Sequence, residues 1–470
     1  MKPCGFCNYS ASVRHSEPSA DLPPFLCCLF MAIALSSFFG PRRPLPVVRM
    51  LCACVLGLVS RAACANPIDL DALVGIVVAR NPAVLAAAAE ARGANEDLSA
   101  ARWQRFPTFS VQAESQSLHS RDPKASAGTT TALTQPLWMI SGSIPAQIEG
   151  AQAGATARQA RVSEVRYLAA ERTVDAWWGG VTATAKMEIA SRALARLTEF
   201  RSMMRRRVDA SVSPVSELDL VSSRVSQAQS DLASAQASQR LFLSRLEELA
   251  GEPVGPAALV QAAASLEGST LQAASALADL SDAQFAEWVD RHPAVRRANS
   301  EAQVVKAQAK AKDAERWPQL YVKLQHTTAI DGSRGDSGAF LGLQYTPGAG
   351  LSSMDQARAA RARAEGATVA IEQQRREELG AFQADWSELR SSREKEEMLL
   401  PAIGAARAVL ASYERLFIAG RRSWLDVLSA VRELQQNEDA LATARTSAVN
   451  LVARIQLRAG QQAWQREGAL

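Results

Sequence analysis

The residues best suited to catalysis and metal binding, cysteine and histidine, are nearly missing from most of this 470-residue chain. All seven cysteines precede residue 66, and only three histidines follow it, at His119, His292 and His326. No two of these histidines have the spacing of a helical ligand pair, and no glycine-rich phosphate loop precedes a helical run. The sequence therefore predicts no enzyme activity, no cofactor and no metal site.

The first 65 residues have the order of a secretory signal. Basic residues precede an apolar run at 50–59, and Ala63-Cys64-Ala65 then offers a small-residue cleavage site. A lipoprotein, in which Cys64 carries the lipid, is the alternative. We therefore expect an exported protein whose folded part begins near residue 66.

Charge outside this leader is balanced. Six of the 52 basic residues and two of the 48 acidic residues lie in 1–65, which leaves 46 of each sign. A net charge near zero predicts no nucleic-acid partner. After residue 65 no apolar run approaches the roughly 20 residues that a transmembrane helix needs. Strands would therefore have to make any membrane crossing.

The chain is an internal duplication. Three pairs of prolines share one offset of 211 residues: Pro82 with Pro293, Pro107 with Pro318, and Pro136 with Pro347. Each repeat therefore has three prolines in order: the first opens a helical run, the second stops it, and the third follows a polar segment. The predicted domains are a leader, a first repeat, a connector, a second repeat and a tail, at 1–65, 66–256, 257–284, 285–460 and 461–470.

Both repeats have the same predicted elements. Alternating apolar and polar residues predict strand pairs in 108–135 and 318–345. The helical runs are 82–105, 144–210 and 215–250 in the first repeat, and 293–316, 351–418 and 423–459 in the second. The last helix of each repeat has a coiled-coil seam, with Gln239 the one polar member in the first. In each repeat two short helices, stacked end to end, match the long one, which would extend about 100 Å.

The predicted fold is mainly α with a small β part, and that β part is incomplete. Four strands with one apolar face cannot close a barrel, and lipid does not tolerate open sheet edges. Copies of the chain would have to complete the sheet. Three copies would supply twelve strands, although this argument does not fix the number three.

The proline frame, the strand pairs and two turn sequences, 207–219 and 413–428, resemble the TolC family of outer-membrane export channels over roughly residues 66–460. The resemblance implies a homotrimer with a twelve-strand β-barrel in outer-membrane lipid and an α-helical tunnel in the periplasm. It also implies a periplasmic adaptor protein and an inner-membrane transporter, either proton-driven or of the ABC type, as partners.

Alternatives remain at this stage. Small-molecule efflux and the outer-membrane step of type I protein secretion fit the resemblance equally, because neither needs cargo-specific residues in the tunnel. An alternative from another class of protein is a structural protein, a periplasmic coiled-coil rod without a pore. The rod requires that 108–135 and 318–345 are loops rather than strands.

The resemblance further implies where the periplasmic entrance closes. In such channels, acids just after the second-repeat turn narrow the entrance, and Asp426 and Ser429 match those two positions. Asp219 is the expected first-repeat counterpart of Asp426. Phe417 matches a position that can hold a hydrogen-bonding tyrosine, and Arg422 matches a basic gate position. The remaining candidates lie in the two turns, where an adaptor would dock: Arg207, Ser213, Pro214, Gly420 and Arg421. Of these, Ser213 stands where a turn glycine is common.

The same residues have a plain structural explanation. The sequences that end at Asp219 and Asp426 both fit the capping box, and acids in a first helical turn favour the positive end of the helix. Arg207 and Arg421 lie where a helix C-terminus attracts cations. Capping and gating are compatible roles.

Overall fold

The computed structural model describes five stretches of the chain: 69–116, 126–137, 142–266, 282–329 and 335–460. The predicted leader and tail, and residues 267–281 of the connector, lie outside the described residues. The chain separates into two compact units, Met1–Asn66 and Pro67–Leu470, and every described element belongs to the second.

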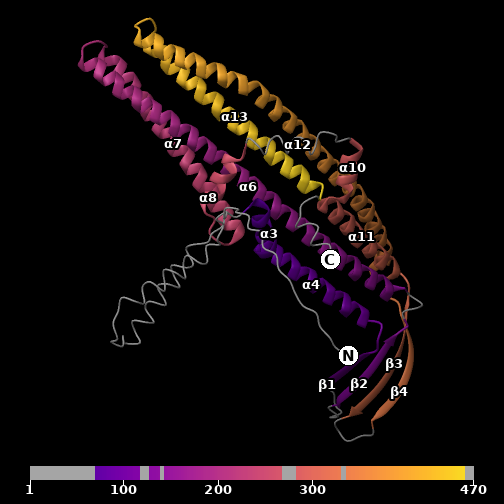
Figure 1. Ribbon diagram of the computed structural model, residues 1–470. Coiled ribbons are helices and arrows are strands. Elements are labelled where there is room, and N and C mark those ends of the chain that lie inside the picture. Colours follow the sequence, from indigo (N-terminus) through magenta and orange to yellow (C-terminus); the bar gives the residue numbers. More distant parts are fainter. Residues whose placement is uncertain (1–68, 117–125, 138–141, 267–281, 330–334, 461–470) are drawn as a thin grey trace, which may run out of the picture. The chain divides into compact units, whose positions relative to one another are not determined.

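The first repeat is organised along one helix of 67 residues, α6 (Ser143–Asp209). At about 1.5 Å per residue, a helix of this size is about 100 Å long. In Figure 1, α4 (Pro82–Trp103) lies along one end of α6 and α7 (Val215–Ala250) lies along the other. The predicted arrangement of two short helices beside a long one is confirmed.

The second repeat has the same plan around α12 (Ser352–Ile418), which also has 67 residues. Along it lie α11 (Pro293–Ala314) and α13 (Trp424–Arg458). The shorter elements are α3 (Leu70–Arg80), α8 (Pro256–Ala264), α10 (Asp282–Arg291) and the 3₁₀ turn η1 (Ala349–Leu351). The helix α8 lies in the stretch that the sequence predicted only as a connector.

None of the described helices is, by itself, long and apolar enough to cross a membrane. The bent pair of α3 and α4 passes that test of length and composition together.

Both repeats begin their proline-led helix alike. Asn81 caps α4, and its side-chain oxygen accepts a hydrogen bond from the Ala83 N–H at 2.9 Å. His292 caps α11, and its Nδ1 accepts from the Ala294 N–H at 3.4 Å. A proline follows each cap at a position where a missing N–H costs no helical hydrogen bond. The duplicated sequence therefore starts the same element twice.

Packing between α6 and α7 follows the predicted seam. Val221, Val225 and Leu246 of α7 are buried. Gln239, the polar member of the seam, donates from Nε2 to the Oγ1 of Thr184 on α6 at 2.9 Å. This bond satisfies an amide that the seam partly buries, so the polar position is compatible with close packing.

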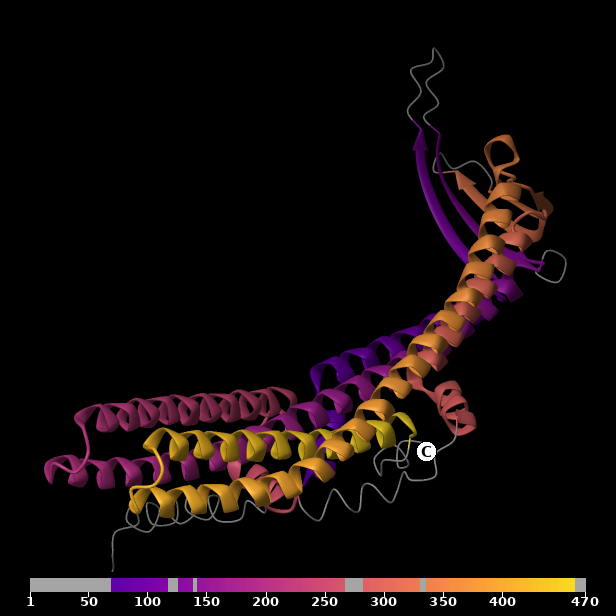
Figure 2. The same cartoon turned by 90° about the horizontal axis from the view of Figure 1, so that it is seen from above.

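A four-stranded antiparallel sheet lies at the end of the long helices opposite to the α6–α7 and α12–α13 turns (Figures 1 and 2). Its strands, in spatial order, are β1 (Thr108–Gln116), β2 (Ser126–Pro136), β3 (Gln319–Ala329) and β4 (Asp336–Gln344). The β2–β3 ladder joins the two repeats, while β1 and β4 are the edges. Both predicted strand pairs are confirmed.

The strand register sorts side chains onto two faces. Phe109, Leu133 and Leu324 are register neighbours on one side, which we call the apolar face, and they are 66%, 39% and 50% exposed. The side chains that alternate with them, such as Thr134 and Lys323, form the polar face. The sheet of one chain thus leaves large apolar side chains without cover.

Candidate functional site

Both long helices end in the same type of hydrogen-bonded turn, and the first lies between α6 and α7. The Val212 N–H donates to the Arg207 carbonyl at 2.8 Å, and the Ser211 N–H donates to the Val208 carbonyl at 2.9 Å. This pair of bonds is the Schellman ending, which requires a left-handed residue just after the helix. Ser211 fills that position with φ = 57°.

The turn between α12 and α13 repeats this geometry. The Arg421 N–H donates to the Leu416 carbonyl at 2.8 Å, and the Gly420 N–H donates to the Phe417 carbonyl at 2.9 Å. Gly420 is left-handed, with φ = 71°. The glycine position of the first turn is therefore occupied by Ser211, and the prediction that Ser213 stands there is wrong.

The helices that follow the turns begin differently. Ser423 caps α13: its Oγ accepts from the Asp426 N–H at 3.3 Å and donates to Asp426 Oδ2 at 2.9 Å. In the first repeat Pro214 is the cap of α7 and makes no side-chain cap bond. The acid in the first turn of α7 is Glu217. The predicted capping box ending at Asp219 is therefore wrong, and Glu217, not Asp219, occupies the position equivalent to Asp426.

Asp426 is held at the tip as a negative charge. Its hydrogen bonds with Ser423 lower the pKa of the carboxyl, and the neighbouring Arg422 guanidinium, 3.4 Å away, acts in the same direction. The Arg422 guanidinium also lies over the Tyr413 ring, 4.6 Å from its centroid. Ser429, the second predicted constriction residue, is exposed on the following turn of α13.

The two tips contact each other through an aromatic group that the sequence did not predict. Trp424 is 2% exposed, and its ring lies 4.8 Å from Phe417 and 5.2 Å from Phe200 of α6. The Arg207 guanidinium lies 4.9 Å from the Phe417 ring centroid, and Arg207 Nε donates to Ser213 Oγ at 3.2 Å. Phe417 is thus buried between the two helical hairpins of its own chain.

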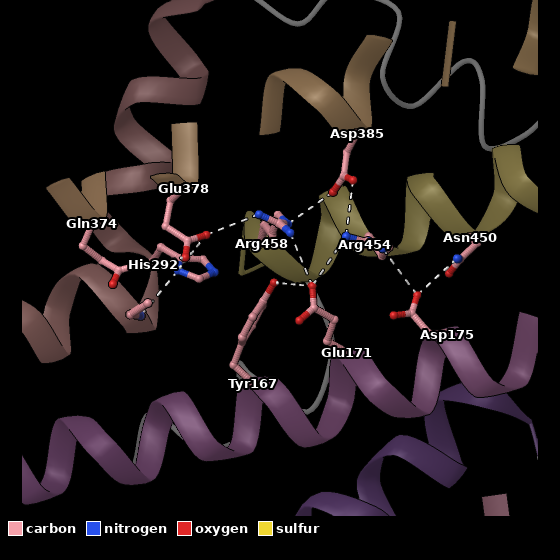
Figure 3. A network of polar contacts seen from close by, with 11 residues as sticks. Tyr167, Glu171, Asp175, His292, Gln374, Glu378, Asp385, Asn450, Arg454 and Arg458 are labelled. Atoms are coloured by element: carbon pink, nitrogen blue, oxygen red, sulfur yellow. Dashed lines mark hydrogen bonds and ion pairs between the residues drawn. The ribbon is translucent and has the colours of Figure 1, made fainter. Parts of the chain in front are cut away.

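A group of charged side chains lies farther along the helices, between α6, α12 and α13 (Figure 3). We call it the ionic cluster, and its members are Tyr167, Glu171, Asp175, His292, Glu378, Asp385, Asn450, Arg454 and Arg458. The first three come from α6, and the others belong to the second repeat. The cluster therefore joins the two repeats.

Arg458 lies at the centre of the ionic cluster and is 8% exposed. Its guanidinium lies 3.4 Å from Glu171 of α6 and 3.3 Å from both Glu378 and Asp385 of α12. Arg454, one turn earlier, lies 3.3 Å from the same Asp385. A buried charge is costly unless partners surround it, so these contacts hold three helices at one level.

Burial disfavours the charged forms of two acids and of the histidine in the cluster. Burial raises the pKa of Glu378 and of Asp385 above the ordinary values, although the neighbouring arginines act in the opposite direction. Burial and then the charge of Arg458 lower the pKa of His292 to about 4. Neutral His292 fits its role as a helix cap, because Nδ1 must accept a hydrogen bond there.

The chain is similar to known proteins in both sequence and fold. Residues 73–252 match the family described as outer membrane efflux protein. Among solved structures, CusC is 15% identical, with a TM-score of 0.71 and coverage of 83% of this chain and 91% of its own. This is the TolC-like fold.

Two further TolC-like structures have a similar fold. The outer-membrane channel OprN is 19% identical, with a TM-score of 0.69 and coverage of 84% of this chain and 90% of its own. VceC of Vibrio cholerae is 16% identical, with a TM-score of 0.67 and coverage of 83% and 96%. No curated protein sequence matches the chain.

In this TolC-like chain the predicted site residues all lie at the two tips, but they form separate groups. Asp426 pairs with Arg422, and Arg207 contacts Phe417. In the part of the chain that the structure describes, no side-chain hydrogen bond or ion pair joins Asp219 to either group. No three His, Cys, Asp or Glu side chains in that part are placed to bind a metal ion.

Sequence analysis missed the ionic cluster, although α13 contains a signal for it. Thr446, Asn450, Arg454 and Arg458 recur every four residues, which places them on one side of the helix. The Oγ1 of Thr182 on α6 donates to Thr446 Oγ1 at 2.8 Å, so the polar side of α13 already contacts α6 one turn before the ionic cluster. A polar stripe beside an apolar seam indicates a second, polar contact between helices.

Proposed function

We propose that three copies of this chain form a passive export duct in the outer membrane, which extends into the periplasm and works with a periplasmic adaptor and an inner-membrane pump. The observation that carries this proposal is the sheet. It is continuous with helices of about 100 Å, exposes an apolar face, and ends in two edges. Four strands are too few to close a barrel, and open edges are not tolerated in lipid, so other copies must supply the missing strands.

Small-molecule efflux is the cargo class that we favour over type I protein secretion. The family match is to efflux proteins, and residues 73–252 include the first strand pair and the first tip. The rod without a pore requires loops where β1, β2, β3 and β4 are found, so the structure contradicts that alternative.

The helix tips are the proposed periplasmic entrance. Asp426, held ionised beside Arg422, would face its copies in the neighbouring subunits and narrow the opening. The other proposed entrance residues are Ser429 and Asp219, which are both exposed. Phe417 is buried between the two hairpins, so its proposed role is to support the tip rather than to line the opening. The proposed adaptor-docking residues of the two turns are Arg207, Ser213, Pro214, Gly420 and Arg421. An adaptor that contacts the turns would act on the helices that carry Asp426.

Extraction and electrical recording test the duct. The protein should require detergent, migrate as a trimer, and give stepwise conductance in planar lipid bilayers. A soluble monomer without conductance would contradict the proposal.

Engineered cysteines test the strand closure directly, since the chain has no cysteine after residue 65. Val111→Cys on β1, combined with Ser337→Cys or Ala339→Cys on β4, should give disulfide-linked dimers and trimers, because these residues share the apolar face and the two edges would meet between copies. The matched control is Thr131→Cys with His326→Cys, which are register partners within one chain and should link only internally. Intermolecular linkage in the control alone would contradict the closure.

A further inference from the structure

Two aromatic rings lie on the polar face of the sheet, where the remaining side chains are small or hydrophilic. Phe340 is the register partner of Lys323, and Lys323 is the partner of Thr134, so all three point to the same side. Tyr321 precedes Lys323 by two positions on β3 and shares that side. The rings interrupt a surface of threonine, serine and glutamine.

Glycines on β4 allow both rings to lie against the backbone. Tyr321 is the register partner of Gly342, and a Cβ placed at Gly342 would lie under 3.0 Å from three atoms of the Tyr321 side chain. A Cβ at Gly338 would likewise come within 2.9 Å of the Phe340 ring. The rings therefore lie low against β4, and Phe340 is 51% exposed.

Lys323 lies opposite Phe340 and two positions from Tyr321 on β3, without an acidic partner in the described part of the sheet. The acids of the polar face are at the far end: Asp336 is the partner of Thr327, four residues beyond Lys323 on β3. Four residues of a strand span about 13 Å, so that carboxylate is too distant for an ion pair. The ammonium group is thus free to attract an anion that also stacks on the rings.

We propose that Tyr321, Lys323 and Phe340 form a cargo-contact site for small aromatic anions on the wall of the duct. The inference rests on the proposed function, because the polar face lines a water-filled interior only if the strands close. Three copies would place three such sites around the interior, between the long helices and the end of the sheet that carries Asp336. An aromatic ring would stack on Phe340 or Tyr321, and its carboxylate would pair with Lys323.

Block of single-channel current tests this site, with salicylate as the probe. Salicylate should block the current of the unmodified trimer. Lys323→Gln and Phe340→Leu should each raise the blocking concentration about tenfold, the loss of one modest contact. The matched control is Phe109→Leu, which makes the same change on the apolar face and should leave block unchanged. Acetate lacks a ring and benzylamine carries the opposite charge, so both should block weakly in every variant.

The outcomes separate the two proposals. A trimer that conducts but shows no salicylate block, or equal block in Lys323→Gln, overturns the cargo site and leaves the duct intact. A trimer without conductance overturns both. If Phe340→Leu fails to assemble, the decision rests on Lys323, where Lys323→Arg should keep the block that Lys323→Gln loses.

Discussion

The backbone of Ser211, in the first tip, is strained. Ser211 adopts φ = 57°, a left-handed conformation that costs a residue with a Cβ about 1–2 kcal/mol. Its equivalent in the second repeat, Gly420, adopts φ = 71° without that cost. We predict that Ser211→Gly raises the free energy of unfolding by about 1 kcal/mol, measured by denaturant titration of the purified protein.

The duplication supplies the control for this change. Gly420→Ser should lower the free energy of unfolding by a similar amount, since it introduces the same strain at the second tip. A loss of stability in Ser211→Gly would show that the Ser211 side chain makes a contact worth more than the strain.

His292 gives the fold a pH dependence of known sign. Its pKa is lowered from 6.5 to about 4 in the folded chain, so the unfolded chain binds the proton more readily between these values. Stability should therefore fall as the pH falls from 6.5 to 4, by up to about 3 kcal/mol from this group. His292→Asn should remove that part of the slope, measured as the free energy of unfolding against pH.

Asparagine is the apt replacement because the first repeat already uses it. Asn81 accepts the same hydrogen bond from the helix that it caps, at 2.9 Å, so His292→Asn keeps the cap and removes the titration, together with the ring contact with Tyr167 and the contact with Glu378. The raised pKa values of Glu378 and Asp385 oppose the histidine term and remain in both proteins. Identical slopes in the two proteins would contradict the role of His292.

At the scale of the elements, α13 is fixed to its neighbours by one buried charge. Arg458 has three acidic partners on two other helices, so its removal leaves buried carboxylates without a counter-charge. We predict that Arg458→Met lowers the free energy of unfolding by about 3–5 kcal/mol. The control is Arg376→Met, which removes one exposed pair with Glu372 and should cost less than about 1 kcal/mol. Equal losses in the two variants would show that burial of the cluster does not matter.

The elements also show what a sequence can and cannot predict. Pro82 and Pro293 mark helix starts, and alternating residues mark the strands, because both signals act within a few neighbouring positions. The contact between Glu171 and Arg458 joins positions 287 residues apart, which no local pattern specifies. Ser211 was missed for another reason, because serine carries no general preference for the left-handed conformation that the turn imposes.

The whole assembly decides what Asp426 does. Within one chain its carboxylate is a helix-capping partner, with Ser423 and Arg422 as its contacts. In a trimer three such carboxylates would approach the axis at the periplasmic end. An aspartate carboxylate is charged at neutral pH, and the lowered pKa of Asp426 extends that charge to lower pH, so the combined field of three would attract a multivalent cation into the entrance.

Capping and gating can be separated by two substitutions. Asp426→Ala removes the carboxylate, and we predict that a trivalent cation such as La³⁺, added on the periplasmic side of a bilayer, then needs a concentration about tenfold higher to block the current. Ser423→Ala removes the cap hydroxyl, lowers stability by about 1 kcal/mol, and keeps the charge, so its block should match that of the unmodified channel. Equal loss of block in both variants would assign the effect to helix capping, because the two variants share only the loss of the cap and not the loss of the charge. Block unchanged in Asp426→Ala would exclude this carboxylate from the entrance.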